Sequence, residues 1–198
     1  IRGSTAGDHF DRVDLEGVQI WNNRTRSVLF ISGYSELVGG FVTAAGNSFW
    51  DSGSGSYHDS FAAHADNHST IRLFTSIWQD HQAFLESDGS EVHVDCLLLE
   101  TTAGTTSAGA NMLGFDPRFR DAAIGDLSLR PDSPAIDACD TFLYSPIHAD
   151  YDLDGRGFES TTRPNVLGPF DRGADESPLL FASGFASGNF AGWSSTQP

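Results

Sequence analysis

Short segments in which apolar and polar residues alternate recur through the first hundred positions of the chain. The clearest covers residues 91–98, where every second residue is apolar: Val92, Val94, Cys96 and Leu98. Period-two alternation of this kind predicts a half-buried β-strand. Shorter apolar patches lie at 13–20, 28–31, 37–42 and 71–77, separated by Gly, Asn, Ser and Asp. Because no window repeats apolar residues with a helical period, we expect an all-β chain with little helix.

Many short strands suit a sandwich, a barrel or a solenoid, and the spacing of asparagines favours the solenoid. Four of them, Asn23, Asn47, Asn67 and Asn111, are 24, 20 and 44 positions apart. These intervals are close to multiples of about 22 residues, a plausible length for one turn of a solenoid. Asparagines at equivalent turns can stack and form hydrogen bonds along the axis. The alternative is that each asparagine simply marks a turn.

The second half of the chain carries a series of short motifs. These are DPRF at 116–119, SPAID at 133–137 and DRGADE at 171–176. In this order they resemble the closing segment of right-handed parallel β-helix proteins of the pectin-lyase-like superfold, and more narrowly the bacterial choice-of-anchor Q type. Segments 74–78, 94–98 and 111–113 resemble coils of the same family, so the similarity spans about residues 70–176.

The resemblance implies an all-β, right-handed parallel β-helix fragment with a loop-rich C-terminal cap. We expect β-helix coils over 1–114, the cap over 115–176 and a Phe/Gly/Ser-rich tail over 177–198. The apolar faces of 13–20, 37–42, 71–77 and 92–98 should line one continuous interior in parallel strands. Segment 141–170, rich in Pro, Gly and Asp, should wrap over the end of the coil stack, which exposes strand edges that need cover.

Within the cap, Leu129 and Ile136 have the spacing to cover that open end. Asp137 and Asp175 are then interpreted as acceptors for backbone N–H groups of the loops and not as catalytic acids. Cys139 stands where the resembled motif usually has Gly, and an exported protein favours oxidation. A disulfide between Cys96 and Cys139 would fasten the cap to the last coil; two cysteines alone cannot form a structural zinc site.

The resemblance also places the protein outside the cell. The opening residues suit the middle of a fold, so we expect the C-terminal part of a longer secreted or surface-displayed protein whose signal peptide lies elsewhere. Residues 177–198 resemble a short tail found on many secreted bacterial proteins, although Ala186 replaces the usual acidic residue. This tail is either a sorting element or a weakly ordered end.

The charge of the chain narrows its partners. It has 27 acidic residues against 11 basic ones, all of them Arg, and a net charge of −16. Nucleic acids and anionic membranes bind clustered Lys and Arg, so both are excluded as expected partners. No apolar run approaches the ~20 residues of a membrane span. An acidic surface tolerates neutral glycans and attracts divalent cations, although it also serves solubility alone.

The sequence offers one candidate calcium site. Asp150, Asp152 and Asp154 alternate and are followed by Gly155, as in a calcium-binding loop. The twelfth position is Thr161, so the bidentate Glu of an EF-hand is missing; Glu159 or Asp171 could replace it if the fold brings either close. The alternative is a turn in which the Asp side chains bond to the backbone.

The other candidates are less specific. His64, Asp66 and His68 would point the same way in an extended chain and could bind zinc, although residues 52–60 beside them suit an exposed polar loop. Arg72 could neutralise a uronate, but no motif selects it. Trp50, Tyr57 and Trp78 could stack on sugar rings or fill the core.

No catalytic set is identifiable: the G-x-S-x-G element of serine hydrolases is absent, and no pair of carboxylates stands out among the acids. We therefore expect a module that is either structural or interacts with polysaccharide or a cell-surface glycan. The alternative is the C-terminal part of a polysaccharide lyase or glycoside hydrolase, which rests on fold analogy alone. An enzyme should cluster Arg, Asp or His in a groove on one β-face, whereas a structural module should not.

Overall fold

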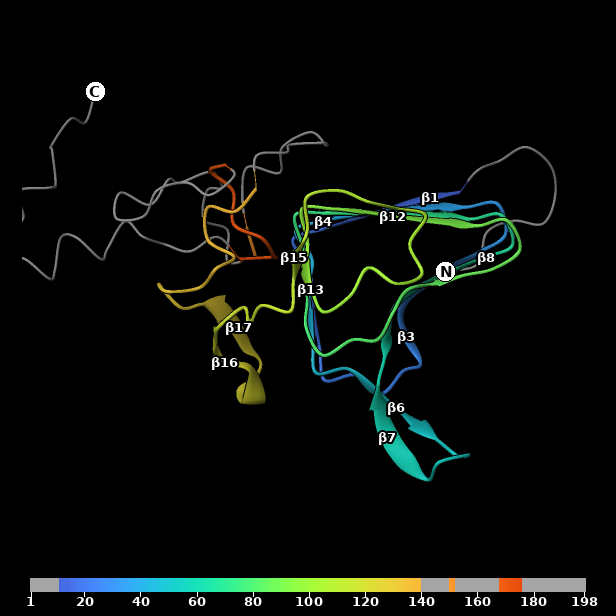
Figure 1. Ribbon diagram of the computed structural model, residues 1–198, viewed down its shortest axis with the longest axis horizontal. Coiled ribbons are helices and arrows are strands. Elements are labelled where there is room, and N and C mark those ends of the chain that lie inside the picture. Colours follow the sequence, from blue (N-terminus) through green and yellow to red (C-terminus); the bar gives the residue numbers. More distant parts are fainter. Residues whose placement is uncertain (1–10, 140–149, 152–167, 176–198) are drawn as a thin grey trace, which may run out of the picture.

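The structure is a computed structural model that describes residues 11–139, 150–151 and 168–175. Over these residues the chain is all-β, with parallel sheets and a single 3-10 turn, η1 (Ala122–Ile124). Most strands belong to three parallel sheets (Figure 1). Sheet 1 has the order β1 (Arg12–Glu16), β4 (Glu36–Gly40), β9 (Thr70–Phe74), β12 (Glu91–Asp95) and β14 (Ser107–Ala108).

Sheets 2 and 3 follow the same scheme. Sheet 2 has the order β2 (Gln19–Trp21), β5 (Thr43–Ala45), β10 (Ile77–Trp78), β13 (Leu98–Leu99) and β15 (Met112–Leu113). Sheet 3 has the order β3 (Ser27–Ser32), β8 (Phe61–Asp66) and β11 (Leu85–Glu86). The chain passes through sheets 1, 2 and 3 in this order three times and then passes twice through sheets 1 and 2 alone, and each passage is called a circuit here.

The apolar alternation along sheet 1 forms the interior, as the sequence predicts. Leu37 pairs with Val13 on one side and with Ile71 on the other, and Ile71 pairs in turn with Val92. Leu37, Ile71 and Val92 are almost fully buried in one cluster with Ile31, Ala63 and Trp78 from the other sheets. The prediction of parallel strands lining one interior is therefore confirmed for sheet 1.

Each of the apolar segments predicted as one strand contains a corner between sheets 1 and 2, and the alternation of residues does not reveal it. Gly17, Phe41, Thr75 and Cys96 lie between sheets 1 and 2 and all have left-handed backbone, with φ between 47° and 60°. The N–H of Phe41 donates to Phe74 O and that of Thr75 donates to Asp95 O, so the corners stack. Left-handed backbone costs a non-glycine residue roughly 1–2 kcal/mol, which these contacts offset.

The asparagine prediction is correct for one pair. Asn23 Nδ2 donates to Asn47 Oδ1 at 3.1 Å across adjacent circuits, and the next member of this stack is His81, whose Nε2 is 3.3 Å from Asn47 Nδ2. Asn67 lies at a different corner, where its carbonyl oxygen accepts the Tyr34 N–H, and Asn111 precedes β15. For Asn67 and Asn111 the alternative of separate turns therefore applies, because circuits differ in length: successive sheet 1 partners are 24, 34, 21 and 14 residues apart.

The segment expected to be an exposed loop at 52–60 is partly a hairpin. β6 (Ser48–Asp51) and β7 (Ser56–Asp59) pair antiparallel between β5 and β8, and only the turn between them lacks strand structure. The hairpin projects away from the three sheets in Figure 1.

The C-terminal segment covers the side of sheet 2. An antiparallel hairpin of β16 (Phe119–Asp121) and β17 (Asp126–Leu129) begins it. Its buried residues Leu129 and Ile136 pack with Ile77 and Leu98, whose side chains point outward from sheet 2. Figure 1 shows β16 and β17 beside β13 and β15, outside the ring of strands. The expectation that Leu129 and Ile136 close the end of the stack is therefore wrong.

The shortened last circuit covers the C-terminal end instead. Residues 100–106 run from sheet 2 directly back to sheet 1, without a strand in sheet 3. Phe84 N–H donates to Ala103 O at 2.9 Å, and Thr106 N–H donates to Val92 O at 2.7 Å. These bonds hold the crossing segment against the preceding circuit, so the interior is covered where sheet 3 stops.

Residues 168–175 lock the C-terminal segment onto sheet 2. Gly173 N–H donates to Thr75 O and Ala174 N–H to Thr43 Oγ1, at 2.9 and 2.8 Å. A Cβ on Gly173, where φ is 107°, would lie 2.6 Å from Thr43 Oγ1, so the approach requires glycine. The predicted disulfide is confirmed: Cys96 and Cys139 are bonded, with Cα atoms 6.0 Å apart.

Arg172 is the charged member of this junction. It is fully buried, and its guanidinium donates to Leu97 O at 3.1 Å, Ala138 O at 3.2 Å and Ala110 O at 3.3 Å. Burial lowers the pKa of Arg172 to about 10, so it stays charged at neutral pH. Asp137 and Asp175 are buried too, while the Asp137 N–H is accepted by Asp171 Oδ1 at 2.8 Å. Asp171 is thus a buried carboxylate that accepts a backbone N–H of the cap, while the acceptor role expected of Asp137 and Asp175 stays a prediction.

Leu98→Ala should lower the free energy of unfolding by about 2–5 kcal/mol, because it opens a cavity between sheet 2 and Ile136. Chemical denaturation measures the loss. Leu113→Ala is the matched control in the same sheet, since Leu113 is 48% exposed and its truncation should cost less than about 0.5 kcal/mol. Equal losses of stability in the two variants would contradict the packing of Leu98 against Ile136.

Replacing both Cys96 and Cys139 with Ala should lower the free energy of unfolding by about 4 kcal/mol, the entropy expected for a loop of 43 residues. The same loss should follow reduction of the native protein with dithiothreitol. If the reduced protein and the double variant both unfolded at the native denaturant midpoint, the bond would not stabilise the junction.

Candidate functional site

The hairpin β6–β7 presents two exposed aromatic rings. Trp50 and Tyr57 are directly opposite in its register, with ring centroids 5.1 Å apart and planes at 69°. They are 56% and 51% exposed, a large apolar area for a surface hairpin. The Arg24 guanidinium carbon lies 5.1 Å from the Tyr57 centroid, so a cation covers part of that ring.

The local sequence holds the hairpin in shape. Asp51 Oδ1 accepts the Gly53 N–H at 2.9 Å, and Gly55 supplies the positive φ that the turn needs. Backbone hydrogen bonds, first from Gly53, lower the pKa of Asp51. Phe49 and Phe61 of β8 stack at 6.2 Å between centroids. The hairpin is thus attached to sheet 3 through Phe49, while Trp50 and Tyr57 remain exposed.

Further rings lie on the outer face of sheet 3 and at the corner that follows its strands. Phe30 meets His64 edge to face at 5.1 Å between centroids, and Tyr34 meets His68 in the same way at 5.0 Å. Phe30 and Tyr34 are both exposed. Together with the hairpin, these residues give this side of the molecule most of the exposed aromatic side chains among the described residues.

The zinc hypothesis for His64, Asp66 and His68 finds no support. His64 packs on Phe30, Asp66 Oδ1 accepts the Ser87 hydroxyl, and His68 Nδ1 is hydrogen-bonded with Asp88 O. Each side chain has its own partner, and no group of three or more His, Cys, Asp or Glu in the described ranges could hold a metal ion. Only the first two lie on β8, since His68 follows the strand with left-handed backbone.

The candidate calcium loop falls mostly outside the described residues. Asp150 is described and buried, and the neighbouring Tyr151 N–H donates to Ala174 O at 2.9 Å. Asp152 and Asp154 are not described, and neither is Glu159. The calcium site therefore stays a sequence-based prediction.

Arg72, the candidate for binding a uronate, lies on the outer face of sheet 1. Its Nε donates to Glu36 Oε1 at 3.1 Å, and Arg12 reaches the other oxygen of Glu36 at 3.5 Å. Both guanidinium groups are half-exposed. A shared carboxylate already balances part of their charge, which weakens this position as an anion site.

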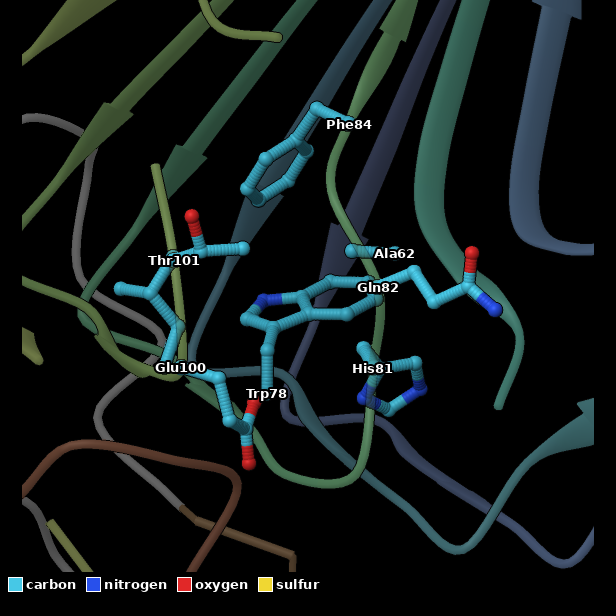
Figure 2. A pocket seen from close by; sticks show the side chains of 8 residues that line it. Ala62, Trp78, His81, Gln82, Phe84, Glu100 and Thr101 are labelled. Carbon is cyan, nitrogen blue, oxygen red and sulfur yellow. The ribbon is translucent and has the colours of Figure 1, made fainter. Parts of the chain in front are cut away.

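Trp78 has the structural role among the aromatic candidates. It is fully buried at the base of a small hollow, so it cannot stack on a sugar (Figure 2). The hollow is lined by Ala62, Trp78, His81, Gln82, Phe84, Leu99, Glu100 and Thr101. The indole N–H of Trp78 meets no acceptor among the described residues.

Ionisable groups beside Trp78 are shifted by burial. Burial lowers the pKa of His81 from 6.5 to about 4, so its imidazole is neutral at physiological pH. Burial also raises the pKa of Glu100, whose Oε1 accepts the Asp80 N–H at 2.9 Å. For Asp80, burial raises the pKa first, and the charges of Asp59 and Asp116 add to it. Of these three groups only His81 is buried in the core, whereas Asp80 and Glu100 lie at the surface beside the hollow.

Sequence reasoning had named Trp50 and Tyr57 but not the hairpin that pairs them. The signal was present: SFWD at 48–51 and SYHD at 56–59 flank a turn rich in Gly and Ser. Two aromatic patches separated by such a turn are typical of a hairpin with a longer loop.

Comparison of the chain with protein-family models, with curated proteins and with solved structures gave no match. Among the described residues no helix has the length and apolar character to cross a membrane.

His81 should make stability depend on pH. Its folded pKa of about 4 lies below 6.5, so between these values the unfolded chain binds more protons and acidification destabilises the fold. The contribution of neutral His81 to the free energy of unfolding is fully present above pH 6.5. About 3 kcal/mol of this contribution is lost when the pH falls to 4. Urea unfolding measures this loss. Between pH 7 and pH 4 the free energy of unfolding of the native protein should fall by this amount more than that of His81→Leu.

The His81→Leu variant is itself the control for the other titrating groups. Subtracting the His81→Leu curve from that of the native protein removes the opposite contributions of Asp80 and Glu100. A His81→Leu protein with the native pH dependence would show that His81 is not held neutral by burial.

Proposed function

We propose that this chain is a right-handed parallel β-helix module of a secreted or surface-displayed bacterial protein, and that it binds polysaccharide or a cell-surface glycan. The constant order in which the chain enters three parallel sheets supports the β-helix. The disulfide between Cys96 and Cys139 supports an oxidising compartment outside the cytosol.

The observation that carries glycan binding is the exposed pair of Trp50 and Tyr57. Aromatic faces offer sugar rings an apolar surface, and rings held at the end of a rigid hairpin lose little entropy on binding. The hairpin is held by the Phe49–Phe61 stack and by the Asp51 turn, so the two rings are positioned before a ligand arrives.

The charge of the protein narrows the glycan class. With a net charge of −16, it repels polyanions such as polyuronates at low ionic strength. Arg24 lies against Tyr57 and is the cation closest to that ring among the described contacts. Neutral polysaccharides therefore fit better than acidic ones.

The alternative is the C-terminal part of a polysaccharide lyase or glycoside hydrolase. It would use the outer face of sheet 1, where Arg72 is the candidate for neutralising a uronate. The pairing of Arg72 with Glu36 speaks against a free anion-binding cation at this position. Neutral-glycan binding through the hairpin is therefore the better-supported function.

Trp50→Ala should weaken binding to a neutral polysaccharide by about tenfold or more, because it removes one stacking face. Affinity electrophoresis in gels containing soluble neutral glucans, xylans or mannans measures the shift. Tyr57→Ala should act in the same direction, and neither variant should alter the melting temperature, since both rings are exposed.

Phe115→Ala is the matched control, because Phe115 is 55% exposed but lies far along the chain from the hairpin. It should retain native binding. If Trp50→Ala and Phe115→Ala bound equally well, or if the native protein migrated unretarded in every neutral gel, the proposed function would be wrong.

A further inference from the structure

Three polar side chains meet on the outer face of sheet 1, near its C-terminal edge. His93 lies in β12, Glu91 lies two residues earlier on the same strand, and Ser107 lies opposite His93 in β14. Residues two apart on a strand share a face, and directly paired residues of neighbouring strands lie side by side. The backbone alone therefore places Glu91, His93 and Ser107 together.

Both nitrogens of the His93 ring are engaged. Nδ1 is 2.7 Å from Ser107 Oγ, and Nε2 is 3.0 Å from Glu91 Oε2. An ionised carboxylate only accepts hydrogen bonds, so Nε2 carries the proton that it shares with Glu91. In the neutral imidazole Nδ1 then has the free lone pair, and the Ser107 hydroxyl donates its proton to it.

We propose that Ser107, His93 and Glu91 form a nucleophilic triad that hydrolyses small acyl esters. Ser107 is the nucleophile, His93 the general base and acid, and Glu91 the positioning residue that fixes the ring and its tautomer. Such a triad is recognised by its geometry and not by a sequence motif, so the missing G-x-S-x-G element does not exclude it.

The neighbourhood suits this role. Ser107 is exposed, whereas His93 is only 21% exposed and therefore held in one orientation. β14 is the last strand of sheet 1, and Gly109 N–H donates to Val94 O of β12 at 2.8 Å. Because successive N–H groups of a strand point to opposite sides, the N–H of Ala108 points to the open edge. Ser107 therefore lies at the open edge of the sheet, where a substrate can reach its hydroxyl.

A carboxylate fixes this edge. Asp95 Oδ1 accepts the Ala110 N–H at 2.8 Å, and a Cβ on Gly109 would lie 2.1 Å from the same oxygen. The chain after Ser107 is therefore held against β12 by a contact that only glycine permits. Arg72 pairs with His93 in the register from the other side, which puts a half-exposed cation in the next position of the row.

The reaction balances without a cofactor. Ser107 Oγ attacks the ester carbonyl carbon while its proton passes to His93 Nδ1, and the carbonyl oxygen takes up the electron pair. Collapse of this intermediate breaks the carbon–oxygen bond, and the alcohol leaves with the proton from His93. Water then attacks the acyl-serine, His93 takes its proton and returns it to Ser107 Oγ, and the carboxylic acid is released.

The open surface sets the substrate class. The triad lies on a strand face at the sheet edge, so it can reach small esters such as acetyl groups, and the residues that the structure describes form no walls around it that would position a peptide. Esters also have good leaving groups, which a weakly enclosed site requires. The triad is on sheet 1, whereas the aromatic hairpin lies between β5 of sheet 2 and β8 of sheet 3. This inference therefore does not depend on glycan binding.

The decisive experiment treats the 198-residue protein with a fluorophosphonate probe and locates the label by peptide mass spectrometry. Attack by Ser107 Oγ on phosphorus displaces fluoride and leaves a stable adduct. Label is expected on Ser107 in the native protein, with none on that peptide in Ser107→Ala. Hydrolysis of 4-nitrophenyl acetate should fall about tenfold or more in the same variant.

Ser56 is the matched control, because its Oγ is 3.1 Å from His58 Nε2. The carboxylate closest to that imidazole, Asp51, lies 3.9 Å from the same nitrogen, so this pair lacks a group that orients the ring from its other side. Ser56 should remain unlabelled, and Ser56→Ala should hydrolyse the ester at the native rate. Equal labelling of Ser56 and Ser107, or no label on Ser107, would overturn the proposal.

Glu91→Gln tests the positioning role separately. It should lower kcat about tenfold with KM unchanged, and Glu91→Asp should restore part of kcat. The melting temperature should stay within the range of the native protein, because Glu91 is half-exposed. An unchanged kcat in Glu91→Gln would show that His93 acts without Glu91, and the triad would be wrong.

Discussion

The structure depends on burying both faces of sheet 2. One face completes the interior through Trp78 and Leu99, and the other packs Ile77 and Leu98 against the C-terminal segment. A sheet covered on both sides needs a second layer of chain, and residues 115–139 with 168–175 supply it. The Cys96–Cys139 bond and the Arg172 hydrogen bonds are all located at this junction. Without the outer layer, a row of apolar side chains would face water.

The alternation of residues was sufficient to predict the sheet that faces water on one side. Val92 and Val94 point inward while His93 points outward, as period two requires. It was insufficient for sheet 2, where Leu97, Leu98 and Leu99 are all buried and the pattern is continuous. A continuous apolar run predicts a buried strand, but it does not show which layer each face of the strand packs against. For this reason the sequence predicts the wrong position for Leu129 and Ile136, at the end of the stack and not on sheet 2.

The candidate sites show the same limit. Trp50 and Tyr57 could be named from composition, but their pairing depends on a hairpin register. Ser107 and His93 come together only because the last circuit is 14 residues long, which depends on where residues 100–106 cross the interior. Circuit length follows from packing against Phe84 and Val92, and no local propensity encodes it. The disulfide could be anticipated because a resemblance placed Cys139 near the last coil.

The corner between sheets 2 and 3 holds residues 22–26 in the first circuit, 46–60 in the second and 79–84 in the third. Strands on either side of it keep their parallel partners despite this threefold variation in length. Chain length at this point is therefore nearly decoupled from the registers of the sheets, and adding residues costs little closure entropy. The corner is a natural acceptor for foreign sequence: a peptide epitope transplanted in place of the turn at 52–55 would be displayed on a rigid stem. Lineages could likewise change what this module contacts without redesigning its core.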